Sequence, residues 1–135
     1  MLYATNEATG ALLWSQPVAN GDNSSPAVDS SHVYVSYPDN YYAFDLTTGA
    51  LAWHDALGGD GGGGRTPVAA DGHVFIRDPT ASNGIFSAGD GSLQGPLGSS
   101  TAPAVANGIA YELDGSLLEA APNDGAGPDR LDVLG

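Results

Sequence analysis

The chain has 135 residues, of which 41% are hydrophobic, and this length and composition are typical of one globular domain with its own core. Three arginines and no lysine stand against 16 acidic residues, which gives a formal net charge of −13 at pH 7. This balance argues against nucleic acid and anionic membranes as partners, because both bind clustered basic residues. The absence of cysteine excludes disulfides, thiolate nucleophiles and cysteine-ligated metals. The favoured explanation for the excess of acidic residues is that they keep the protein soluble, and adaptation to a high-salt habitat is the alternative explanation.

In chain order, the predicted elements are short strands joined by turns, and no stretch has the apolar period of a long helix. Most strands alternate or are rich in β-branched and aromatic residues. Asp71-Gly72 and Asn107-Gly108 are pairs that favour two-residue hairpin turns, since both positions need positive φ. The best-defined strands of one copy are predicted at Pro26–Val28, His32–Ser36, Tyr41–Asp45 and Ala50–His54.

These strands belong to a repeated unit. The stretch Tyr3–Trp14 recurs 39 residues later as Tyr42–Trp53, with the Thr-Gly pair and the tryptophan at the same internal spacing. A second anchor, Pro26–Val35, recurs at Pro67–Ile76 and again at Pro103–Glu112. A period near 40 residues with four antiparallel strands per copy predicts an all-β fold built of β-propeller blades.

The repeats divide the chain into a partial propeller of about three blades plus a leading half-blade. The predicted boundaries are a half-blade at 1–20, blades at 21–60 and 61–98, a degenerate blade at 99–128 and a tail at 129–135. Complete propellers have about four to eight blades. We therefore expect a fragment of a larger ring, or a protomer that completes its ring with partners, because open blade ends promote association.

The pattern Tyr-Ala-x-Asp-x-x-Thr-Gly-x-x-x-Trp, preceded by Ser-Pro-Ala-Val, resembles the PQQ-type repeat. This repeat forms the blades of quinoprotein-dehydrogenase-like propellers and of the outer-membrane β-barrel assembly lipoprotein. The resemblance implies that Trp14 and Trp53 dock between neighbouring blades, with Gly10 and Gly49 allowing close approach. One copy departs from the pattern, since Gly95 stands where its tryptophan should be, and we expect a weaker contact there.

Other candidate sites carry little specific signal. The glycine-rich segment 58–64 lacks the lysine of a phosphate-binding loop, and a connection between blades is the favoured interpretation. His32 and His73 occupy equivalent positions in successive copies, which leaves a paired site open, although half-exposed strand residues are favoured. No zinc spacing or nucleophile elbow is present, so no catalytic or metal-binding residue is predicted.

Four tyrosines cluster around one predicted hairpin. Strand alternation places Tyr34 and Tyr42 inward and Tyr37 or Tyr41 outward. Cross-strand packing is the favoured interpretation. The alternative is an exposed contact patch for protein or glycan, formed by Tyr37 and Tyr41.

The resemblance also bears on cofactors. Quinoprotein enzymes of the family hold PQQ with a calcium ion, a stacking tryptophan, an arginine and usually a vicinal cysteine pair. This chain lacks cysteine, and both of its tryptophans are assigned to blade docking. No cofactor-binding residue is therefore predicted, and PQQ and calcium are expected only if the chain is part of a dehydrogenase.

A non-enzymatic scaffold is the favoured function. It would bind protein partners, or the remaining blades of its own propeller, in the periplasm, at the cell surface or outside the cell. No signal peptide is visible and no apolar run reaches membrane-spanning length, so membrane insertion is not expected. The alternatives are a fragment of a PQQ-dependent quinoprotein dehydrogenase and an extracellular ligand-binding or sensor propeller of a larger receptor.

Overall fold

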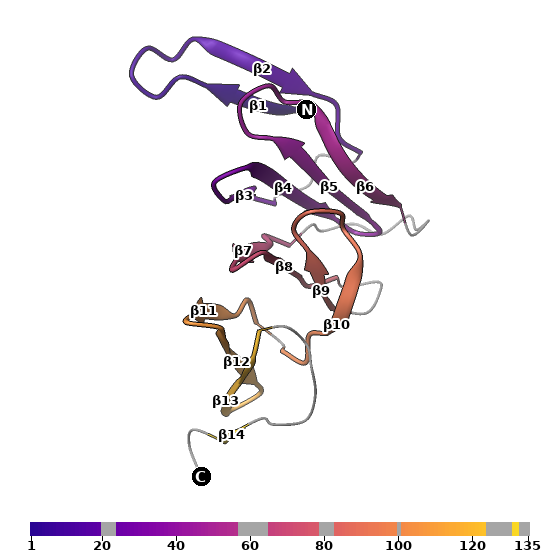
Figure 1. Cartoon of the computed structure of the whole chain (residues 1–135), viewed down its shortest axis with the longest axis vertical. Helices are drawn as coiled ribbons and strands as arrows, with labels where there is room; N and C mark the ends of the chain where they lie inside the picture. Colours follow the sequence, from indigo (N-terminus) through magenta and orange to yellow (C-terminus); the bar gives the residue numbers. More distant parts are fainter. Residues whose placement is uncertain (20–23, 57–64, 79–82, 100, 124–130, 133–135) are drawn as a thin grey trace.

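A computed structural model of the chain describes residues 1–19, 24–56, 65–78, 83–99, 101–123 and 131–132. These residues form one two-stranded and three four-stranded antiparallel sheets, which follow one another along the long axis of the molecule (Figure 1). The prediction of an all-β chain of propeller blades with a leading half-blade is confirmed. None of the described segments is a helix long and apolar enough to cross a membrane.

The half-blade contains β1 (Leu2–Thr5) and β2 (Leu12–Gln16). The first full blade contains β3 (Ala27–Val28), β4 (His32–Tyr37), β5 (Asn40–Asp45) and β6 (Leu51–Ala56). The second contains β7 (Val68–Ala70), β8 (His73–Ile76), β9 (Gly84–Ser87) and β10 (Leu93–Pro96). The third contains β11 (Ala104–Ala106), β12 (Ile109–Asp114), β13 (Leu117–Pro122) and β14 (Leu131–Asp132).

Each full blade is a simple meander in which sequential strands are neighbours. The first strands of successive blades contact one another, β3 with β7 and β7 with β11. They therefore form the inner side of the row, and the fourth strands β6 and β10 lie on its outer rim (Figure 1).

The predicted hairpin turns are present. Asp71 and Gly72 have φ of 51° and 79°, and Asn107 and Gly108 have φ of 53° and 76°. Positive φ at both positions gives the turn the twist of the flanking strands, which closes β7 on β8 and β11 on β12. In the first full blade the turn differs, because the Asp29 carboxylate accepts hydrogen bonds from the backbone N–H groups of Ser31 and His32 at 2.7 and 2.8 Å.

The core lies between the sheets, and the central strands of the first two full blades are buried on both faces. One face of the first full blade packs against the half-blade and contributes Val35, Tyr37, Tyr42 and Phe44. The other face packs against the second full blade and contributes Tyr34, Tyr41, Ala43 and Trp53. We call the interface between two neighbouring blades a seam. Alternation along a strand here separates two seams rather than core from solvent.

This arrangement corrects the prediction for two tyrosines. Tyr37 is 7% exposed and Tyr41 is fully buried, so the alternative interpretation, in which they form an exposed contact patch, is wrong. Tyr37 faces the seam with the half-blade, and Tyr41 faces the seam with the second full blade. Side chains do alternate between the two faces, but the assumption that one face is exposed is wrong because both faces of the sheet are covered.

The boundary of the last blade also differs from the prediction. Leu131 and Asp132 were assigned to a tail, but they form β14, which pairs with β13. The seven residues between Asn123 and Leu131 include two glycines and a proline, and this insertion obscures the repeat in the sequence. The third full blade therefore extends at least to Asp132.

Candidate functional site: the blade seams and an outer-rim groove

The first seam is closed by a tryptophan lying on a glycine. Gly49 has φ of +72°, and a Cβ atom built on it would lie 2.6 Å from Cδ2 of Trp14. The indole Nε1–H of Trp14 donates a hydrogen bond to the carbonyl oxygen of Leu46 at 3.2 Å. No other residue type leaves room for the ring at this position, so the Thr-Gly turn forms the binding surface for the tryptophan.

The second seam repeats this geometry one blade further along the chain. A Cβ atom on Gly91, whose φ is +75°, would lie 2.8 Å from Cδ2 of Trp53. The Nε1–H of Trp53 donates to the carbonyl oxygen of Ala88 at 3.0 Å. Each tryptophan thus packs on the turn of the following blade rather than on the glycine of its own repeat.

Gly10 occupies the equivalent turn of the half-blade. Its φ is +71°, but no described atom lies within 4 Å of the position its Cβ would take. The sequence paired Gly10 with Trp14 as one docking motif, whereas the structure places Trp14 on Gly49. The surface above Gly10 is therefore open among the described residues.

A buried carboxylate adds a polar contact to the second seam. Asp78 is 6% exposed, and its Oδ2 accepts hydrogen bonds from the Tyr41 hydroxyl at 2.7 Å and from the backbone N–H of Asp39 at 2.9 Å. Burial raises the pKa of Tyr41 well above its usual range, and the hydrogen bond to Asp78 raises it further. Sequence reasoning missed this contact, because Tyr41 and Asp39 lie 37 and 39 residues before Asp78 in the chain.

The third seam has no tryptophan, since Gly95 stands at that position. Leu97 fills the apolar part of this seam together with Phe75, Ile85 and Ala110. Asp71 contributes the polar part, because its Oδ2 accepts from the backbone N–H of Gly108 at 3.2 Å and from Asn123 Nδ2 at 3.0 Å.

The structure does not join the histidines into a metal site. His32 Nδ1 lies 3.4 Å from the Tyr34 hydroxyl, and His73 Nδ1 is buried without a hydrogen-bond partner. The third histidine, His54, stacks on Tyr42 with ring centroids 4.2 Å apart. Among the described residues, no three His, Asp or Glu side chains are grouped closely enough to hold a metal ion. The glycine-rich segment 58–64 lies outside the described residues.

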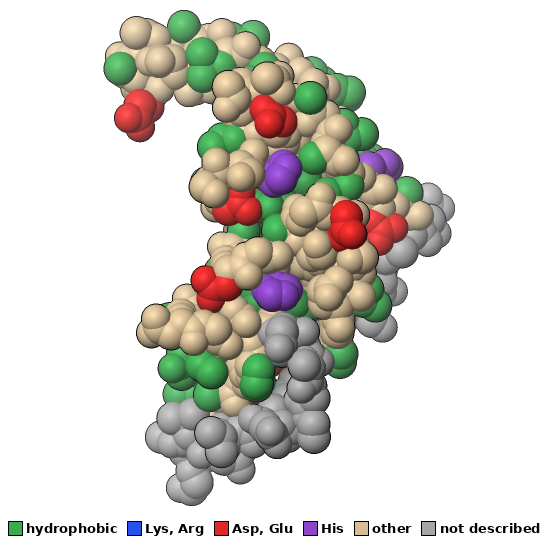
Figure 2. Space-filling view, viewed as in Figure 1, with side chains coloured by type: hydrophobic (Ala, Val, Ile, Leu, Met, Phe, Trp, Pro, Cys, Tyr) green, Lys and Arg blue, Asp and Glu red, His purple; other side chains and the backbone are tan. Residues whose placement is uncertain are grey.

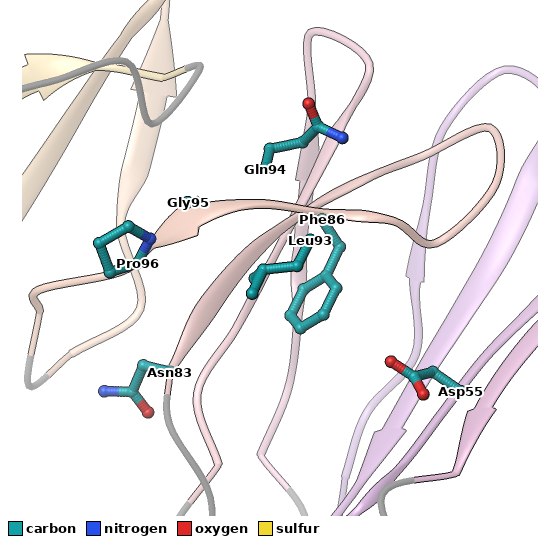
Figure 3. A pocket seen from close by; sticks show the side chains of 7 residues that line it. All are labelled: Asp55, Asn83, Phe86, Leu93, Gln94, Gly95 and Pro96. Carbon is teal, nitrogen blue, oxygen red and sulfur yellow. The ribbon is translucent and has the colours of Figure 1, made fainter.

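A groove of about 560 Å³ lies on the outer rim, between β6 of the first full blade and β10 of the second. Its lining residues are Asp55, Asn83, Phe86, Leu93, Gln94, Gly95 and Pro96. Figure 3 shows Phe86 and Leu93 side by side at the centre of this groove, with the Asp55 carboxylate turned toward them from the neighbouring blade. Sequence reasoning did not identify this groove.

Glycine makes room for the apolar wall of the groove. A Cβ atom on Gly84 would lie 2.7 Å from Phe86 and 2.9 Å from Leu93. Gln94 points away from the centre in Figure 3, and its amide nitrogen donates to Ser92. Both ends of the Asn83 amide are also occupied, by the backbone of Asp78 and of Ser99. Among the described residues, Asp55 is the charged group that lines the groove.

The protein as a whole is strongly acidic. On the face shown in Figure 2, acidic side chains are distributed along the row of sheets, and no lysine or arginine is visible among the described residues. With a formal net charge of −13, the protein surface favours cationic over anionic ligands.

Comparison with known proteins identifies the family that shares this architecture. A family model described as outer membrane protein assembly factor BamB matches residues 1–126. The chain belongs to this BamB family. The repeats that resembled the PQQ-type blade are thus BamB-family repeats, and the resemblance stated from the sequence is confirmed. No curated protein sequence matches the chain.

Solved structures share the BamB-type fold at low sequence identity. BamB from Moraxella catarrhalis aligns with a TM-score of 0.72 and 14% identity, over 91% of this chain and 40% of that one. A quinohemoprotein alcohol dehydrogenase from Pseudomonas putida HK5 aligns with a TM-score of 0.56 and 18% identity, over 81% of this chain and 20% of that one. A europium-containing methanol dehydrogenase aligns with a TM-score of 0.59 and 16% identity, over 83% of this chain and 25% of that one. The chain thus spans less than half the length of each of these structures.

Proposed function

We propose that this BamB-family chain is a non-enzymatic propeller segment that acts as a protein-interaction scaffold in the cell envelope. Membership of a family named for outer-membrane protein assembly is the observation that carries the proposal. A role in the assembly of outer-membrane proteins, in the periplasm, is the specific form that we favour.

The use of the tryptophans supports a scaffold over an enzyme. Trp14 and Trp53 both lie in seams, with their Nε1–H groups bonded to backbone carbonyl oxygens of the next blade. Neither indole is available to stack on a quinone without opening a seam. The alternative, a segment of a quinoprotein dehydrogenase, draws support from the dehydrogenase alignments, but at 16–18% identity these alignments concern the fold alone.

The experiment is site-specific photo-crosslinking in intact cells of the source organism. A photoreactive residue replaces exposed positions on the outer rim, such as Leu51 and Leu93, and, as a control, the buried Val74. A scaffold gives crosslinks to discrete envelope proteins from the exposed positions and none from the control. Crosslinks to no envelope protein, or quinone-dependent dye reduction by the protein after loading with PQQ and calcium, would contradict the proposal.

A further inference from the structure

The outer-rim groove combines an apolar wall with one unpaired acid. Phe86 is buried at 4% exposure, whereas Leu93 is 66% exposed, so an apolar surface is accessible from solvent. Asp55 is half-buried at the edge of this surface. Its carboxylate forms no hydrogen bond or ion pair with another described residue, whereas the Asn83 amide is bonded at both ends and the Gln94 amide nitrogen donates to Ser92.

These contacts define the chemistry of an occupant. An apolar group that covered Phe86 and Leu93 would also remove water from the Asp55 carboxylate, and burying an unpaired charge is costly. A cation next to the apolar group removes this cost, because it pairs with the carboxylate as the water leaves. An anionic occupant would be repelled by Asp55 and by the net negative charge of the protein.

The outer rim also favours an extended chain. β10 is the outermost strand of its sheet, and residues Leu93–Pro96 all line the groove. The free edge of a strand can pair with an extended peptide, while pockets beside it take alternate side chains. Pro96 lacks an N–H group and limits such pairing to a few residues. A volume of about 560 Å³ exceeds one side chain and lies within the range of about 300–1,000 Å³ that is usual for ligand sites.

We propose that this groove binds an extended segment of a protein partner, with a bulky apolar side chain against Phe86 and Leu93 and a neighbouring lysine or arginine at Asp55. The proposal rests on the scaffold function, because it assigns the partner's chemistry. A second copy of the chain is a poorer occupant, because each copy has a formal net charge of −13 and the two copies would repel each other.

The test is selection from a random library of short peptides displayed on phage, followed by binding measurements on synthetic peptides. Peptides that bind the protein should be enriched in an apolar residue beside lysine or arginine. The best of these is then synthesised with arginine and with neutral citrulline in its place. We expect about tenfold weaker binding of the citrulline peptide, and NMR shift changes confined to β6, β9 and β10.

Matched variants separate the groove from general attraction to an acidic protein. Asp55→Asn should bring the arginine peptide down to the affinity of the citrulline peptide, whereas Glu7→Gln, at an exposed acid of the half-blade, should leave it unchanged. Leu93→Ser should weaken both peptides at least tenfold. Its control is Leu51→Ser, the equivalent position one blade earlier and 56% exposed, which should weaken neither.

The inference is overturned if no such peptide is enriched, if Glu7→Gln matches the effect of Asp55→Asn, or if the shift changes lie away from the groove. Photo-crosslinks to envelope proteins from a photoreactive residue at Gln94, which lines the groove, would also overturn it if they persist undiminished in the Leu93→Ser protein, while the scaffold function would stand. Loss of all envelope crosslinks from every rim position would instead count against the scaffold function itself.

Discussion

The fit between tryptophan and glycine in the seams can be measured by placing the same methyl group at two equivalent turns. Gly91 and Gly10 have φ of +75° and +71°, and each donates a backbone hydrogen bond to the residue four positions earlier, at 2.9 and 2.7 Å. Alanine in a left-handed conformation costs roughly 1–2 kcal/mol at either site. Only at Gly91 does the new Cβ meet an indole, at 2.8 Å from two carbon atoms of Trp53.

The difference between the two variants therefore isolates the seam. Carbon atoms pack best at about 3.5–4.0 Å, so the indole of Trp53 must move by about 1 Å to admit the methyl group. Trp53 is 9% exposed, with its Nε1–H bonded to Ala88, so this movement disturbs a packed site. Overpacking of this kind costs about 1–3 kcal/mol. We expect Gly91→Ala to lose about 2–5 kcal/mol of unfolding free energy and Gly10→Ala about 1–2 kcal/mol.

The assay is urea unfolding followed by circular dichroism at one fixed protein concentration, because association would otherwise change the apparent stability. Tryptophan fluorescence reports in parallel on the surroundings of the indoles. Equal loss of stability in the two variants, with unchanged fluorescence, would refute the view that the glycine is required by the tryptophan that lies on it.

Three further predictions concern titratable side chains. Tyr41→Phe should lower stability by about 1.5–3 kcal/mol in urea unfolding, because the buried Asp78 carboxylate loses a hydroxyl donor at 2.7 Å. Burial, followed by hydrogen bonding to aspartate, raises the pKa of Tyr34 and Tyr41 in the folded protein, so stability should be full below about pH 10 and fall as the pH rises further. Replacing both with phenylalanine should flatten that fall, and an unchanged slope in unfolding at alkaline pH would contradict it. The backbone N–H and then the hydroxyl of Thr48 hold the pKa of Asp45 below its usual range. The contribution of Asp45 to folding stability should therefore be present above about pH 4 and be lost in acid. An NMR titration of the carboxyl group checks the lowered pKa, and the Asp45→Asn variant should lose less stability in acid than the unchanged protein.

The fold was predictable because its signals are local and repeated. Asp71-Gly72 and Asn107-Gly108 specify their turns through backbone conformation alone, which does not depend on distant residues. The recurrence of a tryptophan after each Thr-Gly pair marks the fourth strand of the blade. These local features predict the order of the strands and the β-propeller class of the blades, and they do so without reference to the contacts between blades.

The seams and the groove were less predictable because they depend on contacts between blades. The burial of Tyr41 requires the second full blade to cover a face that a single sheet would leave in water. Asp78 has no sequence feature that distinguishes it from the turn aspartates, and its partners come from the preceding blade. Asp55 and Leu93 likewise face each other only after two blades have stacked.

The contact of each tryptophan with the following blade gives each of the first two seams a direction. One side contributes an indole and the other a left-handed glycine with a nearby carbonyl oxygen, as at Trp14 with Gly49 and at Trp53 with Gly91. Such an interface is heterologous, and two identical faces cannot pair through it. Joined blades can therefore extend only head to tail, and whether the result closes into a ring or continues as an open helix depends on the rotation between successive blades.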